Sequence, residues 1–188
     1  MGKFDWFWKA MGSTTERNNK KSKAVVANAH GLIDELSLLD DASLAETVRA
    51  TVRDGAVSDA PRFLAGLSVA SQRTLGMTPF EVQNQAVLRL LEGDVIQMAT
   101  GEGKTLVGAM AATGFALQGK RVHLITVNDY LAARDAEWMR PLVEFFGLRV
   151  AAVTQTSTRD ERVAAYRADV VYAPVTEIGF DHLRDNQI

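Results

Sequence analysis

The octapeptide Met-Ala-Thr-Gly-Glu-Gly-Lys-Thr at residues 98–105 constrains the fold of this 188-residue chain more than any other feature. The apolar run at 95–98 leads into it and is typical of a buried strand, whereas the alanine-rich stretch at 106–118 is typical of a helix. Glycines at such a junction let backbone N–H groups turn inward, and the new helix directs its positive end to the same place. The order strand, glycine turn, lysine, hydroxyl and helix therefore predicts a phosphate-binding loop.

Four residues of this loop have expected roles in binding phosphate or Mg²⁺. Gly101 and Gly103 open the backbone around the phosphates. Lys104 can reach the β and γ phosphates, and the hydroxyl of Thr105 can bind Mg²⁺. Met98 departs from the usual pattern, which opens with glycine or, in many helicase-like ATPases, alanine. The alternative is a chance match at an ordinary loop.

Composition limits the class of protein. Apolar residues make up 47% and charged residues 23% of the chain, as in soluble globular proteins, and the length suggests one domain or slightly more. The net charge of −2 argues against a general nucleic-acid binder. No cysteine is present, which excludes disulfides and thiol chemistry. No run is long enough to span a membrane, and Asp5 and Lys9 interrupt any signal-peptide core, so we expect a cytosolic protein.

Residues 1–23 form a distinct basic and aromatic arm. Phe4, Phe7, Trp8 and Met11 fall on one face of a helix, and basic side chains surround them. Such a stripe either lies on an anionic membrane surface or packs on the protein's own core. Residues 12–23 are polar, and we expect them to be mobile.

The segment up to residue 93 is expected to be helical. Ser43 and Glu46 have the spacing of a capping box, which predicts a helix running to Gly55. A second helix is predicted from residues 58–61 to Gly76, and a third from 80 to 92.

After the loop the pattern alternates between strands and helices. The predicted strands are 122–127, 148–153 and 169–173, and the predicted helices are 128–146, 158–167 and 176–185. Such alternation indicates right-handed crossovers and a parallel sheet, with ligands at the carboxyl ends of the strands. The predicted fold class is α/β, a parallel-sheet P-loop NTPase of the RecA or helicase-like kind, preceded by an all-helical N-terminal region.

Four segments together resemble the SecA preprotein translocase ATPases. They are residues 77–83, the loop at 98–105, residues 126–135 and residues 177–186. Their order and spacing match that family from about residue 30 onward, and the opening methionine of the loop resembles the family's own form. Ala99 and residues 135–139 resemble the accessory actinobacterial paralogue more than the housekeeping protein.

This resemblance implies an ATP-driven motor that moves preproteins across the cytoplasmic membrane. ATP and Mg²⁺ are the implied cofactors, and residues 101–105 are the implied phosphate-binding set, with Lys104 and Thr105 as the catalytic candidates. Glu102 is expected to contribute its backbone N–H more than its carboxylate. The family's adenine-reading glutamine corresponds to Gln83, with Gln85 as a near competitor. Thr78 stands where the family often has arginine, which puts one nucleotide contact in doubt.

The resemblance also implies domain organisation and partners. Residues 24–188 are expected to be the first nucleotide-binding fold, with a helical part at 24–93 and an α/β part at 94–188 that stops before the family's Asp-Glu strand. We expect an N-terminal fragment that binds nucleotide weakly and hydrolyses it negligibly by itself. The implied partners are a SecYEG-type channel and preproteins, with an anionic membrane surface as a further candidate. No nucleic acid is expected, and the implied location is the cytoplasmic face of the membrane.

The polar residues of the last two segments have two interpretations. Asn128, Asp129, Arg134 and Asp135 are either helix caps and ion pairs or functional groups, and the same holds for Asp181, Arg184 and Asp185. Asp169 comes before the apolar strand residues 170–172 rather than after them, so it does not stand where the catalytic acid belongs.

Two other functions compete with the motor. A superfamily-2 helicase would have a similar loop and upstream glutamine, but residues 24–188 carry more acidic than basic side chains. A non-catalytic docking module is the third hypothesis.

Overall fold

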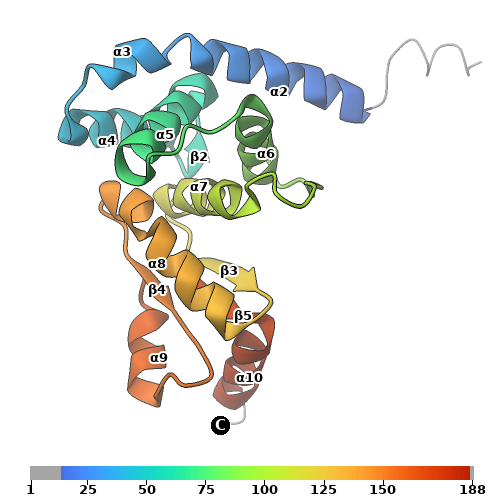
Figure 1. Cartoon of the computed structure of the whole chain (residues 1–188), viewed down its shortest axis with the longest axis vertical. Helices are drawn as coiled ribbons and strands as arrows, with labels where there is room; N and C mark the ends of the chain where they lie inside the picture. The colour runs from blue at the N-terminus through green and yellow to red at the C-terminus, as the bar shows by residue number, and fades with distance from the viewer. Residues whose placement is uncertain (1–13, 187–188) are drawn as a thin grey trace, which may run out of the picture.

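The structure, a computed structural model, describes residues 14–186. The aromatic stripe at residues 4–11 therefore lies outside the described residues. The elements are, in chain order, α2 (Thr14–His30), α3 (Ile33–Ser37), α4 (Asp41–Ala50), β1 (Val52–Arg53), β2 (Ala56–Val57), α5 (Ala60–Leu75), α6 (Glu81–Leu91), α7 (Lys104–Leu117), β3 (Val122–Thr126), α8 (Asp129–Phe145), β4 (Val150–Ala152), α9 (Arg159–Ala165), β5 (Val170–Pro174) and α10 (Val175–Asp185). Figure 1 shows the helices up to α7 stacked above a small sheet, which carries α8, α9 and α10.

Helix α2 includes much of the segment that we expected to be mobile. That expectation is wrong from Thr14 onward, because the chain is helical there and packs against α5 and α6. Ser22, Val26 and Ala29 are buried on one side, and Lys20, Lys21 and Lys23 are exposed. The glutamate, arginine and lysines of this segment are good helix formers, so its polar composition did not indicate a loop.

The capping box that we predicted at Ser43 and Glu46 is also wrong. Asp40 caps α4 instead, and its carboxylate accepts a hydrogen bond from the Ser43 N–H at 2.7 Å. The helix ends at Ala50 rather than Gly55, and the short antiparallel hairpin β1–β2 follows. The N-terminal region is therefore helical with one small hairpin.

Helix α5 is the centre of the upper part. Asp59 caps its start, and Gly76, at φ +68°, ends it, as predicted. Every residue from 63 to 71 is buried, with α2, α3, α4 and α8 packed around the helix. This core holds α6 and α7, and thus the loop between them, in place.

The sheet has three parallel strands in the order β3-β5-β4, which confirms the predicted parallel sheet. Val170 and Tyr172 of β5 belong to the main core, which includes residues of α7 and α8. Val171 and Ala173 point to the opposite face and pack with residues of α9 and α10. The sheet is thus covered by helices on both faces, as parallel sheets require.

The strand that we predicted before the loop is not formed. Residues 94–99 form neither a strand nor a helix, and they pair with no strand among the described residues. Ile96 and Met98 pack against the core, whereas Val95 is 99% exposed. An apolar run becomes a strand only when a neighbour takes up its N–H and C=O groups.

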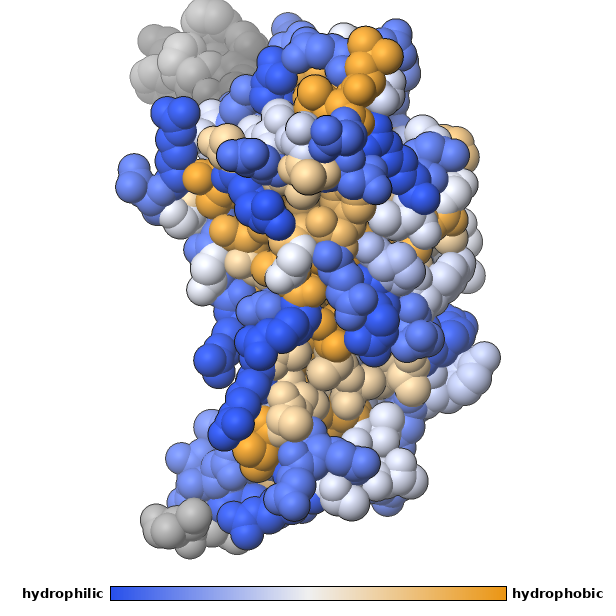
Figure 2. Space-filling model, turned by 90° about the vertical axis from the view of Figure 1, so that its left-hand side faces the viewer, coloured by the Kyte–Doolittle hydropathy of each residue, from blue (hydrophilic) through white to orange (hydrophobic). Residues whose placement is uncertain are grey.

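The surface gives no sign of a membrane-spanning element in the part that the structure describes. None of its helices has the length and apolar character needed to cross a bilayer. Figure 2 shows hydrophilic side chains around a pale, weakly apolar strip in the lower half of the molecule. A hollow of about 450 Å³ between β4 and α9 is lined largely by alanines.

Candidate functional site

The glycine-rich loop leads directly into α7. Gly103 is the N-cap residue of that helix, and the backbone φ angles are +87° at Gly101 and +77° at Gly103. These are left-handed conformations that favour glycine. A Cβ at Gly103 would also lie 2.2 Å from Nε2 of Gln83. The loop therefore has a tightly fitted backbone at Gly103.

The loop holds the Lys104 ammonium group close to its own backbone. Nζ of Lys104 donates to the carbonyl oxygen of Ala99 at 2.7 Å and to that of Met98 at 3.1 Å. The first N–H groups of a helix have no partner within the helix, and those of α7 begin at this position. A cationic side chain and helix N–H groups thus meet at one place, which is a donor set suited to phosphate.

Glu102 closes the loop. Its carboxylate accepts from the Ala99 N–H at 2.6 Å, and its own N–H donates to the Ala99 carbonyl oxygen at 3.3 Å. Both the backbone N–H and the carboxylate of Glu102 are therefore engaged within the loop in this conformation.

Gln83 is buried beside the loop, with 6% of its surface exposed. It lies in the first turn of α6, where its Oε1 accepts from the Phe80 N–H at 2.9 Å. Its Nε2 donates to the Glu102 carbonyl oxygen at 2.9 Å. The structure thus brings Gln83 to the predicted phosphate site, whereas Gln85 is absent from the cavity lining there.

A cavity of about 550 Å³ opens at the loop, which is a volume typical of small-molecule sites. Its polar end is formed by the loop and includes Lys104 and Thr105. Its other walls are mostly apolar, and the side chains that form them are Met77, Phe80, Leu106, Trp138 and Met139. One polar and one apolar region match the phosphates and the base of a nucleotide.

Thr105 is the residue of the loop with a hydroxyl beside Lys104, and it lines this cavity. Within residues 14–186 no group of three or more His, Cys, Asp or Glu side chains is arranged to hold a metal.

Asp169, which its place in the sequence excluded as the catalytic acid, has a structural contact. It accepts a hydrogen bond from the Arg149 N–H at 2.7 Å. The carboxylate of Asp169 thus holds the backbone at Arg149, the residue that precedes β4.

The polar residues at the start of α8 act as caps and ion pairs. Asn128 caps the helix by accepting from the Leu131 N–H at 2.9 Å. Asp129 accepts from the Gln155 N–H at 3.1 Å. Arg134 pairs with Asp135 at 2.6 Å and lies over the ring of Tyr130. Asn128 thus forms the expected cap, and Arg134 and Asp135 the expected ion pair. Asp129 forms neither within the described residues, and instead holds the loop after β4.

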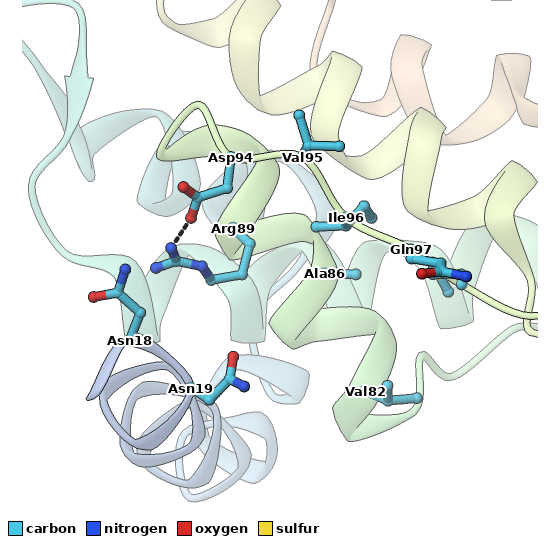
Figure 3. A pocket seen from close by; sticks show the side chains of 10 residues that line it. Asn18, Asn19, Val82, Ala86, Arg89, Asp94, Val95, Ile96 and Gln97 are labelled. Carbon is cyan, nitrogen blue, oxygen red and sulfur yellow. Dashed lines mark ion pairs between the residues drawn. The ribbon is translucent and has the colours of Figure 1, made fainter. Parts of the chain in front are cut away.

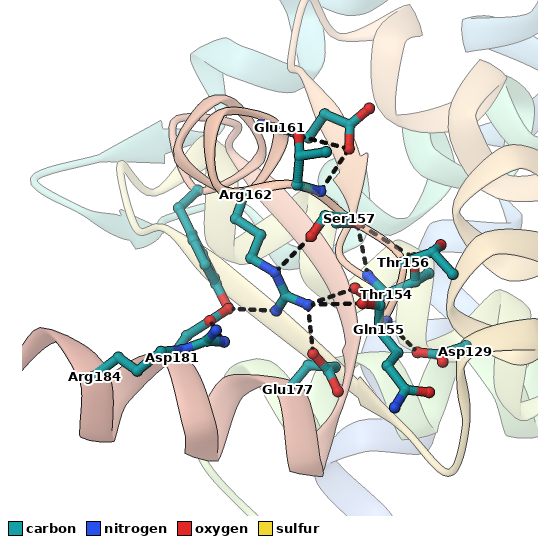
Figure 4. A network of polar contacts seen from close by, with 12 residues as sticks. Asp129, Thr154, Gln155, Thr156, Ser157, Glu161, Arg162, Glu177, Asp181 and Arg184 are labelled. Atoms are coloured by element: carbon teal, nitrogen blue, oxygen red, sulfur yellow. Dashed lines mark hydrogen bonds and ion pairs between the residues drawn. The ribbon is translucent and has the colours of Figure 1, made fainter.

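Arg162 of α9 is the centre of a buried polar network, shown in Figure 4. It pairs with Glu177 at 2.6 Å and with Asp181 at 2.9 Å, and each of the three side chains is only 11–12% exposed. It also donates to the carbonyl oxygens of Thr154 and Ser157, at 2.7 and 3.0 Å. The network fixes α10 against α9 and the loop after β4.

Asp181 has the most strongly coordinated carboxylate of this network. It pairs with Arg184 as well as with Arg162, and it accepts from the Tyr166 hydroxyl at 2.7 Å. Burial alone would raise its pKa, but the hydrogen bonds from Tyr166 and Arg162 and the nearby guanidinium charges hold the pKa below its usual value. Burial and the bond to Asp181 raise the pKa of Tyr166 well above its usual value.

A second cavity, of about 600 Å³, lies between the start of α2, α6 and residues 94–98 (Figure 3). Its charged groups are Arg89 and Asp94, which form an ion pair with each other. Asn18 and Asn19 line the α2 side. The charges of this cavity are already compensated, so we assign it no ligand.

Sequence reasoning found the polar end of the main cavity and missed its apolar walls. Met77 and Phe80 lie in the segment that contains Gln83, and Trp138 lies in the run at 135–139, yet neither pattern indicated that they meet. Nothing in the sequence indicated the role of Arg162 other than its place after the predicted capping box of Thr158 and Glu161. The structure confirms that capping box.

Comparison with known proteins gives a consistent result. A sequence profile of the SecA DEAD-like domain matches residues 7–188. The chain is 63% identical over all its 188 residues to protein translocase subunit SecA 2 of Corynebacterium efficiens. It is 56% identical over 188 residues to the SecA 2 subunit of Corynebacterium diphtheriae, and 51% over 184 residues (97% of the chain) to the SecA 3 subunit of Mycolicibacterium vanbaalenii. It spans 25%, 25% and 23% of these relatives, or about a quarter of their length.

Proposed function

Because this chain belongs to the SecA family, we propose that it forms the ATP-binding part of a motor that moves preproteins across the cytoplasmic membrane. The whole motor is attributed to the longer relatives, of which this chain spans about a quarter. The family match and the relatives favour the motor over the helicase hypothesis. Relatives named SecA 2 also agree with the resemblance to the accessory paralogue.

The position of Lys104 carries the proposal. Its ammonium group contacts two loop carbonyl oxygens at the start of α7, where helix N–H groups also begin. Phosphate oxygens of ATP would accept hydrogen bonds from the same ammonium group and from the backbone N–H groups of residues 103–105. Gly101 and Gly103 keep the backbone free of side chains, and Glu102 holds the loop closed through Ala99.

The nucleotide base would lie in the apolar part of the cavity, next to Gln83. The Gln83 amide offers one donor face and one acceptor face, which suits the edge of adenine. Thr105 would hold Mg²⁺ through its hydroxyl, and Mg²⁺ would supply charge neutralisation between the phosphates. Binding, orientation and closure of the loop are the roles that we propose for this chain's own residues.

We propose a SecYEG-type channel and preproteins as the partners of the whole motor, and the cytoplasmic face of the membrane as its location. The basic and aromatic residues of the arm at 1–23 are the candidates for contact with anionic lipid. We propose that the chain alone binds ATP weakly and hydrolyses it negligibly, since the remaining three-quarters of the relatives' length would supply the rest of the site.

Calorimetric titration of the chain with ATP and Mg²⁺ tests this function. Lys104→Ala should abolish measurable ATP binding. Lys120→Ala is the matched control, because Lys120 lies beyond the other end of α7 and contacts the ring of Phe115. Equal ATP affinity in the unchanged chain and the Lys104→Ala variant would refute the proposed site.

A further inference from the structure

Two aromatic side chains from distant parts of the sequence lie exposed at the same cavity. Trp138 of α8 is 49% exposed and Phe80, at the N-cap of α6, is 73% exposed. Both line the cavity that the glycine-rich loop closes at its polar end. Large aromatic surfaces are usually buried, so their exposure at a cavity indicates a ligand that covers them.

Trp138 is held there by a rigid helix. Helix α8 packs against α5, α7 and all three strands of the main sheet. The neighbouring Met139 is fully buried and Asp135, one turn earlier, is 9% exposed. The inward face of α8 is therefore held by packing. The backbone of Trp138 is fixed as a result, and its indole lies at the edge of the cavity.

Trp138 also lacks a stacking partner within the described residues. The aromatic pairs there are His123 with Tyr166 and Phe145 with Phe146, and the cations over rings lie at Phe115 and Tyr130. The indole is thus available to a planar ligand. Across the cavity lining, the amide of Gln83 provides the polar group that could read the ligand's edge.

We infer that Trp138 stacks on the base of the bound nucleotide and makes the site prefer purine over pyrimidine bases. This inference rests on the proposed function, because the phosphates must lie at Lys104 for the base to reach Trp138. A purine offers the larger flat surface, so a stacking site gains more from it than from a pyrimidine.

Fluorescence gives a direct test of contact. The chain has three tryptophans, so Trp6→Phe and Trp8→Phe together leave Trp138 as the single indole. ATP should quench its emission, whereas inorganic tripolyphosphate, which carries the charges without a base, should bind and leave the emission unchanged. Equal quenching by both, or quenching by neither while ATP binds, would overturn the inference.

Affinity gives the second test, in calorimetric titrations with ATP, CTP and tripolyphosphate. Trp138→Ala should weaken ATP binding by about five- to a hundredfold, as expected for the loss of one base–aromatic stack. CTP binding should weaken less, and tripolyphosphate binding should stay within about twofold, while Trp138→Phe should keep most of the ATP affinity. Phe180→Ala, which removes an exposed aromatic from α10, should change none of these values.

The outcomes separate the two proposals. Equal weakening of ATP, CTP and tripolyphosphate in Trp138→Ala would show a structural role and refute stacking. Unchanged ATP affinity in that variant would also refute it, while loss of binding in Lys104→Ala would still support the phosphate site. Unchanged ATP affinity in Lys104→Ala would refute the proposed function itself.

Discussion

Gln83 donates a hydrogen bond from Nε2 to the carbonyl oxygen of Glu102, at 2.9 Å, and thereby joins α6 to the glycine-rich loop. Its Oε1 accepts from the Phe80 N–H at the same time. An amide nitrogen has two hydrogens and an amide oxygen two lone pairs, so each atom can make one more bond. A base that binds Gln83 would therefore contact the side chain that also holds the loop.

Gln83→Ala should lower the free energy of unfolding by about 1–2 kcal/mol, because it removes a helix cap and leaves the Glu102 carbonyl oxygen without this donor. Urea unfolding followed by circular dichroism measures the change. Gln85→Ala, two residues along the same helix, is the control and should change stability by less than about 0.5 kcal/mol. Equal effects of the two substitutions would contradict the assigned contact.

Gly103→Ala should be more harmful than the same change at Gly119. Both glycines have a positive φ, +77° and +82°, so each substitution costs about 1–2 kcal/mol of backbone strain. Only at Gly103 does the new Cβ meet another group, Nε2 of Gln83, while nothing lies within 4 Å at Gly119. Urea unfolding should show the larger loss for Gly103→Ala, with loss of ATP binding in calorimetry. Similar losses at both positions would indicate that the loop has room for a side chain.

Tyr166, which is partly buried, and Tyr172, which is fully buried, should respond differently to the loss of their hydroxyl groups. The Tyr172 hydroxyl is buried and has no hydrogen-bond partner within the described chain, so Tyr172→Phe should leave stability unchanged or raise it by up to about 1 kcal/mol. Tyr166→Phe removes the hydrogen bond to Asp181 and should cost about 1.5 kcal/mol or more. Thermal unfolding of both variants measures this contrast, and a larger loss for Tyr172→Phe would contradict it.

Arg162→Met should lower the free energy of unfolding by about 3 kcal/mol, because it leaves the carboxylates of Glu177 and Asp181 without their buried partner. Adding Glu177→Gln and Asp181→Asn to it should recover part of the loss, since the uncompensated charges are then gone. Arg159→Met on the exposed side of α9 is the control and should change stability by less than about 0.5 kcal/mol. Denaturant unfolding is the measurement, and no recovery in the triple variant would point to lost packing instead.

Stability should fall in acid partly through Asp181. Its pKa in the folded chain is below its ordinary value of 3.8, so the unfolded chain takes up the proton first as the pH drops. The stabilisation is complete above the unfolded pKa and is lost as the pH falls through the folded value. Asp40 and Glu161 have lowered pKa values as well, owing first to hydrogen bonds from Ser43 and Thr158, and act in the same direction. Unfolding measured between about pH 6 and pH 3 should show a weaker pH dependence in Asp181→Asn, and an unchanged dependence would exclude Asp181 as a contributor.

Local signals in the sequence predicted most elements of the fold correctly. The caps at Asp59 and Thr158 and the stop at Gly76 depend on groups within a few residues, so they can be recognised from sequence alone. The cap of α4 was misassigned because Asp40 and Ser43 both have cap-forming side chains, and only the backbone conformation distinguishes them. The run at 95–98 was misassigned because pairing depends on a neighbour that a local pattern does not show.

The same distinction holds for the candidate site. The loop residues are contiguous, so their spacing carries the prediction. Phe80 and Trp138 are 58 positions apart, and only the packing of α6, α7 and α8 brings them to one cavity. The Arg162 network likewise joins residues of α9 and α10, which no spacing rule relates.

The order of the three strands has a consequence for how the chain folds. Within residues 14–186, strands β3 and β4 do not pair with each other, and each pairs only with β5, which is synthesised after both. The ladder therefore cannot start until residues 170–174 are available, and it then forms on both sides at once. Non-local pairing of this kind slows folding, so we expect the helices near the N-terminus to be structured earlier than the sheet during synthesis.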